Sequence, residues 1–175
     1  MIDQQSHITP RVYVLLLKQD DPRKCTAAKL ARFRFATPLY RLKQVPKRCI
    51  VLNPFAPHVL LHGDGSLAER NGILAVDCSW ERVEKAFAIR IPGQARRLPP
   101  LLASNPVNYA KIHKLSSAEA LAAALYIMGF KDSASRLLTL FKWGEGFFSL
   151  NSELLESYCA ALTEKDLLQA QTEFF

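Results

Sequence analysis

Arg11-Val-Tyr-Val-Leu-Leu-Leu17 is the clearest fold signal in the chain. Such a continuous apolar run predicts a strand buried on both faces, because a half-exposed strand would alternate with polar residues. Residues 49–52, 58–61 and 72–76 are further short apolar runs bounded by Pro, Gly or Asn, and each predicts a strand. Helical patterns at 26–35, with Thr26 as N-cap, and at 79–87 separate them. This alternation predicts an α/β fold with a mostly parallel sheet.

The second half of the chain predicts helices only. Ser116-Ser-Ala-Glu119 is a capping box, and it opens an Ala-rich, apolar segment that ends at Gly129. A helix that is apolar all round should be buried. Further helices are expected at 132–141, 151–162 and 163–174, each beginning with a good cap residue. Residues 88–115 contain four prolines and little periodicity, and a segment of that kind inside a compact domain is usually functional.

Composition fits one ordinary domain, or two small domains that share a core. The chain has 175 residues, of which 49% are hydrophobic and 22% charged, so wholesale disorder is excluded. The longest apolar runs, 12–17 and 121–130, fall short of the ~20 residues of a membrane helix, and no export signal is visible. The four cysteines form no C-x-x-C pair, which argues against a zinc ribbon or disulfides. A cytoplasmic protein with reduced thiols is expected.

Charge gives the first functional indication. Lys and Arg outnumber Asp and Glu by 23 to 16, for a net charge of +7 and a pI near 9.4. The basic residues concentrate at 23–48 and 86–118, stretches without an acid, whereas the chain is acidic from Glu145 onward. This pattern favours an anionic partner, nucleic acid before membrane, over the alternative of an inert solvated surface.

Common catalytic and metal motifs are missing from the sequence. The histidines lack metal-ligand spacing, so no metal site is expected, and no hydrolase triad, Walker A loop or dinucleotide fingerprint is present. From local chemistry alone, the sequence predicts a basic α/β domain plus a helical domain that binds RNA or DNA.

Several segments together resemble the Tsr3 family of ribosomal-RNA aminocarboxypropyltransferases. They are KCTAAKLAR at 24–32, DCSW at 77–80, RLPPLLASNPVNY at 97–109, LSSAEA at 115–120 with its helix to Gly129-Phe130, FKWG at 141–144, and 147–151. The resemblance spans nearly the whole chain in order. Ala110 departs from it, because glycine is expected there, and the missing acidic C-terminal extension of eukaryotic relatives points to the archaeal type.

The resemblance implies a fold and an activity. It implies a SPOUT-like knotted α/β domain at 1–92, an all-helical domain at 93–175, a pocket between them, and a monomer. It further implies transfer of the 3-amino-3-carboxypropyl group of S-adenosylmethionine (SAM) to N3 of a pseudouridine, N1-methylated or not, with release of methylthioadenosine. The expected partner is small-subunit rRNA or the pre-small ribosomal subunit, with no membrane involved.

The family also places candidate residues at the donor. Thr26 and Ser117, at predicted helix N-termini, suit the donor carboxylate, and Trp80 would wall the adenine and the sulfonium methyl. Asp77 ends a strand and would orient the donor or act as general base. Leu52, Pro54 and Leu115 would form an apolar slot for adenine. Main-chain groups of Val76, Leu98 and His113 would bind the polar edge of adenine and the ribose. Without the family, caps and core packing would explain Thr26, Ser117 and Trp80.

Basic residues are the candidates for phosphate contacts, and we expect them on one face, flanking the pocket. They are Arg23, Lys24, Lys29, Arg32, Lys47, Arg48, Arg96 and Arg97. Two alternatives stay open: a SPOUT-type RNA methyltransferase, which the product mass would distinguish, and a non-catalytic rRNA-binding assembly factor, which would lack a donor pocket.

Overall fold

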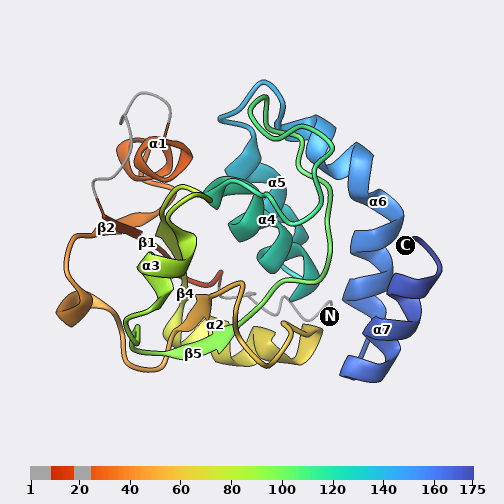
Figure 1. Ribbon diagram of the computed structural model, residues 1–175, viewed down its shortest axis with the longest axis horizontal. Coiled ribbons are helices and arrows are strands. Elements are labelled where there is room, and N and C mark those ends of the chain that lie inside the picture. The colour runs from red at the N-terminus through yellow and green to blue at the C-terminus, as the bar shows by residue number, and fades with distance from the viewer. Residues whose placement is uncertain (1–8, 18–24) are drawn as a thin grey trace, which may run out of the picture.

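Five parallel strands form the single sheet of the described residues, 9–17 and 25–175 of the computed structural model (Figure 1). The strands run in the order β2-β1-β4-β3-β5, and each neighbouring pair is parallel. Their bounds are β1 Val12–Leu16, β2 Thr37–Leu39, β3 Ile50–Leu52, β4 Ile73–Asp77 and β5 Gln94–Arg96. The predictions at 11–17, 49–52 and 72–76 are therefore confirmed.

The central strands divide their side chains between two cores, which confirms the prediction of burial on both faces. On β4, Ile73 and Ala75 join the larger core, whereas Leu74 and Val76 join the smaller one. The larger core continues into the helical half of the chain. The smaller core is closed by loop residues and by Phe87 of the short helix α3.

Seven α-helices surround the sheet in the described part of the chain. They are α1 Thr26–Arg32, α2 Gly65–Asn71, α3 Val83–Phe87, α4 Ser117–Ile127, α5 Lys131–Leu138, α6 Gly144–Ala160 and α7 Glu164–Thr172, with 3-10 turns at Leu42–Gln44 and His62–Asp64. In Figure 1, α4 and α5 lie between the sheet and the pair α6 and α7. The predicted helices are present with two differences: 79–87 shrinks to α3, and the helix expected at 151–162 begins at Gly144, so that Asn151 lies inside α6 and is not its cap.

Helix α4 begins and ends as its sequence predicts. Ser116 is the N-cap, its Oγ accepts a hydrogen bond from the Glu119 N–H at 3.3 Å, and Glu119 completes the capping box. Gly129 follows the helix with φ +92°, the left-handed geometry that favours glycine. The helix is buried on nearly every side and contacts β4, α1, α5 and α6, as expected for an apolar helix.

The expected cap of α1 is wrong by one residue. Cys25, not Thr26, is the N-cap, and its Sγ accepts from the Ala28 N–H at 3.2 Å. Thr26 is the first helical residue, so its hydroxyl is free for another partner. It accepts a hydrogen bond from the Ala118 N–H of α4 at 3.3 Å.

The structure contradicts the expected fold class of a SPOUT-like knotted domain joined to a separate all-helical domain. One hydrophobic core contains Val14 and Ile73 of the sheet together with Leu121 of α4, Leu155 of α6 and Leu167 of α7. The apolar surface of α4 is covered by the sheet on one side and by helices on the other, so the helices cannot form a core of their own. The strand order and pairings of the described residues give no evidence of a SPOUT knot.

The strand expected at 58–61 is absent, and the expected domain boundary can be compared with the structure in the same way. Residues 58–61 form no strand, and only one isolated parallel bridge joins Val59 to Arg97. The domain boundary at residues 92 and 93 stays a prediction, although β5 lies beyond it and pairs with β3. Among the described helices, none has the length and hydropathy to cross a bilayer.

Candidate active-site pocket

A pocket of about 1150 Å³ lies at the carboxyl ends of β3 and β4. Parallel sheets bind ligands at this edge because the loops that follow the strands diverge there. All ten residues proposed to hold the donor line it: Thr26, Leu52, Pro54, Val76, Asp77, Trp80, Leu98, His113, Leu115 and Ser117. The structure thus brings together positions that span more than half of the chain, while their binding roles stay predictions.

The amino ends of α1 and α4 meet at one wall of the pocket. Thr26 and Ser117 are each the first residue of a helix, and the hydrogen bond from Ala118 N–H to Thr26 Oγ1 ties the two ends together. The first N–H groups of a helix have no intrahelical acceptor and carry partial positive charge. This wall therefore suits an anionic group such as a carboxylate.

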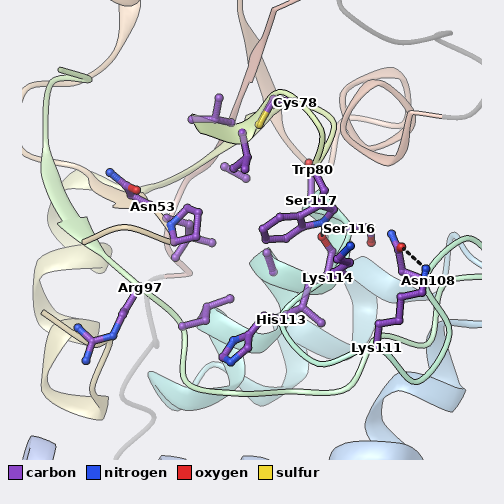
Figure 2. Close-up of a pocket in the computed structure, with 18 of the residues that line it drawn as sticks. Asn53, Cys78, Trp80, Arg97, Asn108, Lys111, His113, Lys114, Ser116 and Ser117 are labelled. Carbon is purple, nitrogen blue, oxygen red and sulfur yellow. Dashed lines mark hydrogen bonds between the residues drawn. The ribbon is translucent and has the colours of Figure 1, made fainter. Parts of the chain in front are cut away.

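Trp80 is held in a fixed orientation at the pocket. Its indole Nε1 donates to the main-chain oxygen of Leu115 at 3.1 Å. Figure 2 shows the ring beside Ser116 and Ser117, with Asn108 and Lys111 on one side and Arg97 on the other. An indole face fixed in this way can pack against a flat ring or a sulfonium group.

Asp77 contacts the cap residue of α1. The Cys25 thiol donates to Asp77 Oδ2 at 3.1 Å. Burial, with further contributions from the hydrogen bond and the charge of Asp77, raises the pKa of Cys25 to about 12. The thiol therefore stays protonated at neutral pH, remains a donor, and fixes the orientation of the carboxylate at the end of β4.

Apolar and main-chain groups form the rest of the pocket. Leu52 and Leu115 are buried, and Pro54 is exposed at the rim. His113 has φ +64°, and its main-chain N–H donates to the Leu101 oxygen at 3.1 Å, so of its two main-chain polar groups the carbonyl is the one available to a ligand. Burial lowers the pKa of the His113 imidazole, so the ring is neutral at pH 7.

Sequence reasoning missed several lining residues. Loops contribute polar and basic lining residues, namely Asn53, Asn105, Asn108, Lys111 and Lys114. Helix α7 contributes four more: Glu164, Leu167, Leu168 and Gln171. The family-like stretch at 97–109 was a usable signal for Asn105 and Asn108. No signal pointed to α7, whose acidic composition suggested a segment apart from the site.

A buried carboxylate organises the loop that precedes α4. Glu119 is fully buried, and its Oε1 accepts from the N–H groups of Ser104 at 2.6 Å and Asn105 at 2.9 Å. Its Oε2 accepts from Asn105 Nδ2 and from the Ser116 N–H, both at 2.7 Å. Asn105 and Ser116 line the pocket, so this residue fixes two parts of the wall at once.

Among the described residues, the basic candidates do not all gather around the pocket: Arg97 lines it, whereas others lie elsewhere. Arg96 forms a bidentate ion pair with Asp64, at 3.1 Å from Nη2 to Oδ1, and Arg97 donates to the main-chain oxygens of Ala56 and Pro57. Lys29 donates to the Leu140 oxygen at 2.6 Å and lies over the Phe141 ring. These side chains hold the fold together.

The positions of Lys47 and Arg48 contradict the expectation that the basic residues lie on one face around the pocket. They precede β3, whereas Leu52 at its other end lines the pocket, so the two sites lie at opposite edges of the sheet. With Arg11 and Arg70 they line a separate cavity of about 380 Å³. Arg32 is exposed beside Phe33, and Arg23 and Lys24 lie outside the described residues. Contact of any of these residues with RNA stays a prediction.

Family models match most of the chain. The model described as "Ribosome biogenesis protein, C-terminal" matches residues 50–175. A second, described as "Possible Fer4-like domain in RNase L inhibitor, RLI", matches residues 10–41. That segment contains one cysteine, Cys25, whereas iron–sulfur clusters are held by several, so its residues do not fit a cluster.

Named relatives match this chain along nearly their full length. A 16S rRNA aminocarboxypropyltransferase from Vulcanisaeta distributa is 46% identical, over 91% of this chain and 88% of its own. The protein of that name from Thermoplasma acidophilum is 47% identical, over 88% of this chain and 93% of its own.

A solved structure supports the same relationship. It is the SAM-dependent rRNA:acp-transferase Tsr3 from Vulcanisaeta distributa, with a TM-score of 0.87 and 44% identity, covering 94% of this chain and 89% of that one. Sequence identity, coverage and fold therefore agree, and the chain belongs to the Tsr3 family of 16S rRNA aminocarboxypropyltransferases.

Proposed function

We propose that this protein transfers the 3-amino-3-carboxypropyl group of SAM to N3 of a pseudouridine in small-subunit rRNA. One observation carries the proposal within this family. The ten candidate donor residues come from five separate parts of the chain and line one pocket at the carboxyl edge of the sheet. The pocket suits the donor in charge, shape and polarity.

The donor is held by complementary groups at its two ends. The carboxylate of its methionine part lies at the wall formed by Thr26 and Ser117, where helix N–H groups and the α4 dipole favour an anion. The adenine occupies the apolar slot of Leu52, Pro54 and Leu115, and Trp80 packs beside the sulfonium. Main-chain groups of Val76, Leu98 and His113 read the adenine edge and the ribose.

The transfer is a displacement at carbon. The lone pair of the pseudouridine N3 attacks Cγ of the donor's methionine part and forms the N–C bond. The Cγ–S bond breaks with its electron pair going to sulfur, so the positive sulfonium leaves as neutral methylthioadenosine. The N3 proton passes to a base or to water, which balances the charge. Orientation of the two reactants supplies much of the acceleration in such a step.

Asp77 is our candidate for the residue closest to the reacting groups. Its carboxylate is oriented by the Cys25 thiol, which remains a donor because its pKa is raised to about 12. Asp77 either orients the donor's ammonium group or accepts the N3 proton. Both roles require the ionised carboxylate, but they act on different steps: orienting the ammonium group acts on donor binding, whereas proton acceptance acts on the transfer itself.

Product selection follows from which carbon on sulfur faces the RNA. When the methyl is buried against Trp80 and the propyl chain faces the pocket mouth, the product carries the aminocarboxypropyl group and methylation is suppressed. A SPOUT-type methyltransferase would present the methyl instead. An assembly factor without donor chemistry would have no use for a pocket of this size.

The substrate and surroundings follow from the same proposal. The enzyme acts as a monomer in the cytoplasm on small-subunit rRNA or its precursor particle. Phosphate contacts fall to exposed cations such as Arg32, whereas Lys47 and Arg48, at the opposite edge of the sheet, contact only RNA that extends beyond the target; such contacts place the RNA without reading its sequence.

The experiment compares product and donor binding. Small-subunit rRNA lacking the modification is incubated with the protein and SAM, and its nucleosides are analysed by mass. We expect the mass of an aminocarboxypropyl group on pseudouridine, whereas a methyl mass or no change would refute the proposal. Trp80→Ala should weaken SAM binding by about 1–3 kcal/mol in calorimetry. Trp80→Phe should lose less affinity. Tyr40→Ala is the matched control, because Tyr40 is an exposed aromatic residue directly after β2 and outside the pocket lining.

A further inference from the structure

The segment between Asn105 and Ile112, here called the tip loop, exposes three large apolar side chains. Val107 is 81%, Tyr109 65% and Ile112 43% exposed. Scattered surface apolar residues need no explanation, but three in one short loop mark a surface that contacts something. The tip loop also borders the pocket, which is lined by Pro106, Val107, Asn108 and Lys111.

The tip loop is anchored at its base. Asn105 is held by the buried Glu119, and the Asn105 oxygens accept from the Asn108 N–H at 3.0 and 3.2 Å. Across the loop, the Ala110 N–H donates to the Ala103 oxygen at 2.7 Å, and Leu102 and Ile112 form an antiparallel bridge. Ala110 adopts φ +60° at the turn. These bonds present Tyr109 at a fixed position.

Two cations follow Tyr109 closely in the sequence. Lys111 and Lys114 are exposed and line the pocket, and neither forms an ion pair within the described part of the chain. Figure 2 shows Lys111 hydrogen-bonded to Asn108, at 3.4 Å, and Lys114 nearer to Trp80. An exposed aromatic side chain in a loop that carries a cation and borders the pocket matches the chemistry that binds single-stranded nucleic acid, where bases stack on rings and ammonium groups contact phosphates.

The reaction requires an unpaired base. N3 of a pseudouridine lies on its Watson–Crick edge, so the base must leave any pair before N3 can reach the donor, and its neighbour must then be held out of a helix. Resting on the proposed function, we propose that Tyr109 is a stacking platform for the unpaired nucleotide next to the target base, with Lys111 and Lys114 contacting the phosphates on either side of it.

The test measures binding of a short, uridine-rich, single-stranded RNA and of the same RNA in a duplex. Tyr109→Ala should weaken binding of the single strand by about tenfold, since stacking contributes about 1–3 kcal/mol per base. Its duplex binding should change by less than about twofold. Tyr109→Phe keeps the ring and should bind like the parent. Tyr40→Ala, which removes an aromatic that is 53% exposed on another part of the surface, is the matched control.

The donor provides an independent readout. SAM affinity of Tyr109→Ala should equal that of the parent, because Tyr109 is outside the pocket lining. Equal affinity of Tyr109→Ala and Tyr40→Ala for the single-stranded RNA would overturn the platform. A parallel loss of SAM binding in Tyr109→Ala would also overturn it, as would a parent protein that binds the duplex as tightly as the single strand. If the parent protein yields no aminocarboxypropyl product, the proposed function fails and the assignment to a neighbouring nucleotide fails with it. A normal product together with unaffected RNA binding refutes the platform alone.

Discussion

Glu119 is the residue whose loss should reveal how the pocket wall is held. Its side chain is completely buried, and its two oxygens accept four hydrogen bonds, two at each oxygen. Glu119→Gln keeps the size of the side chain but replaces one oxygen by an NH₂ group. Whichever way the amide turns, that NH₂ faces two N–H donors in place of an acceptor.

The magnitude follows from the number of donors left without an acceptor. An unsatisfied buried polar group costs about 1–3 kcal/mol, so two of them should lower the free energy of unfolding by about 2–4 kcal/mol after partial relaxation. Glu119→Ala leaves all four donors without the carboxylate and adds a cavity, so its loss should be larger. Small domains have about 5–15 kcal/mol in total, so both variants should still fold at low temperature.

Urea unfolding followed by circular dichroism measures this change. The matched control is Glu153→Gln, an exposed glutamate of α6, which should stay within about 0.5 kcal/mol of the parent. Glu119→Gln should also weaken SAM binding, because Asn105 and Ser116 line the pocket. A Glu119→Gln midpoint equal to that of the control would refute the argument from four accepted hydrogen bonds.

Two further predictions concern other parts of the fold. Gly144→Ala should lower the free energy of unfolding by about 1–3 kcal/mol in urea titrations, because the added Cβ would lie 2.2 Å from the Leu138 oxygen, whereas Gly63→Ala meets nothing within 4 Å and should be neutral. The Cys25 thiol, with its pKa raised to about 12 by burial, should resist iodoacetamide at pH 8 and react only as the pH rises well above 9. Asp77→Asn should accelerate that reaction, since the carboxylate raises the thiol pKa; peptide mass spectrometry measures both rates, and unchanged alkylation would contradict the Cys25–Asp77 contact.

Central strands could be predicted from the sequence, but edge strands could not. Strands β1, β3 and β4 are buried on both faces, so nearly all their side chains are apolar and each strand is visible in the sequence as an apolar run. Strands β2 and β5 are three residues each at the edges of the sheet, and they include Thr37, Gln94 and Arg96. The run at 58–61 is apolar because Val59 and Leu60 are buried as a loop, which periodicity cannot distinguish from a strand.

Helix starts could be predicted where the N-cap is a common polar residue, but not where an unusual residue takes that position. The capping boxes at Ser116 and Thr163 use standard polar caps, and both helices begin as predicted. At α1 a cysteine takes the cap, which residue preferences disfavour, so the prediction moved to Thr26. Helix α2 was not predicted, because a glycine at the first position is more typical of a turn. In the structure, Gly65 lets the helix approach the Met128 oxygen, which an added Cβ would meet at 2.9 Å.

The resemblance to a family indicated the pocket, and two rules of position agree with it. Ligands bind where parallel strands end, and helix N-termini favour anions, so Asp77, Thr26 and Ser117 converge for reasons of backbone geometry. Residues that contribute main-chain groups or apolar surface carry no comparable signal. For Val76, Leu98 and His113 the resemblance to a family was the sole guide, and for α7 there was none.

Charge was the weaker guide, and the reason is geometric. A basic stretch of sequence becomes a basic surface only if its side chains point outward at the same edge of the fold. Here Lys29 and Arg96 instead satisfy a main-chain oxygen and Asp64, and β3 carries Lys47 to the opposite edge from the pocket. Lys111 and Lys114 are among the exposed cations that line the pocket, and a count of charges along the chain does not separate them from the rest. The RNA footprint must therefore be sought from loop geometry, and the anchored tip loop is where exposure, charge and access to the donor coincide.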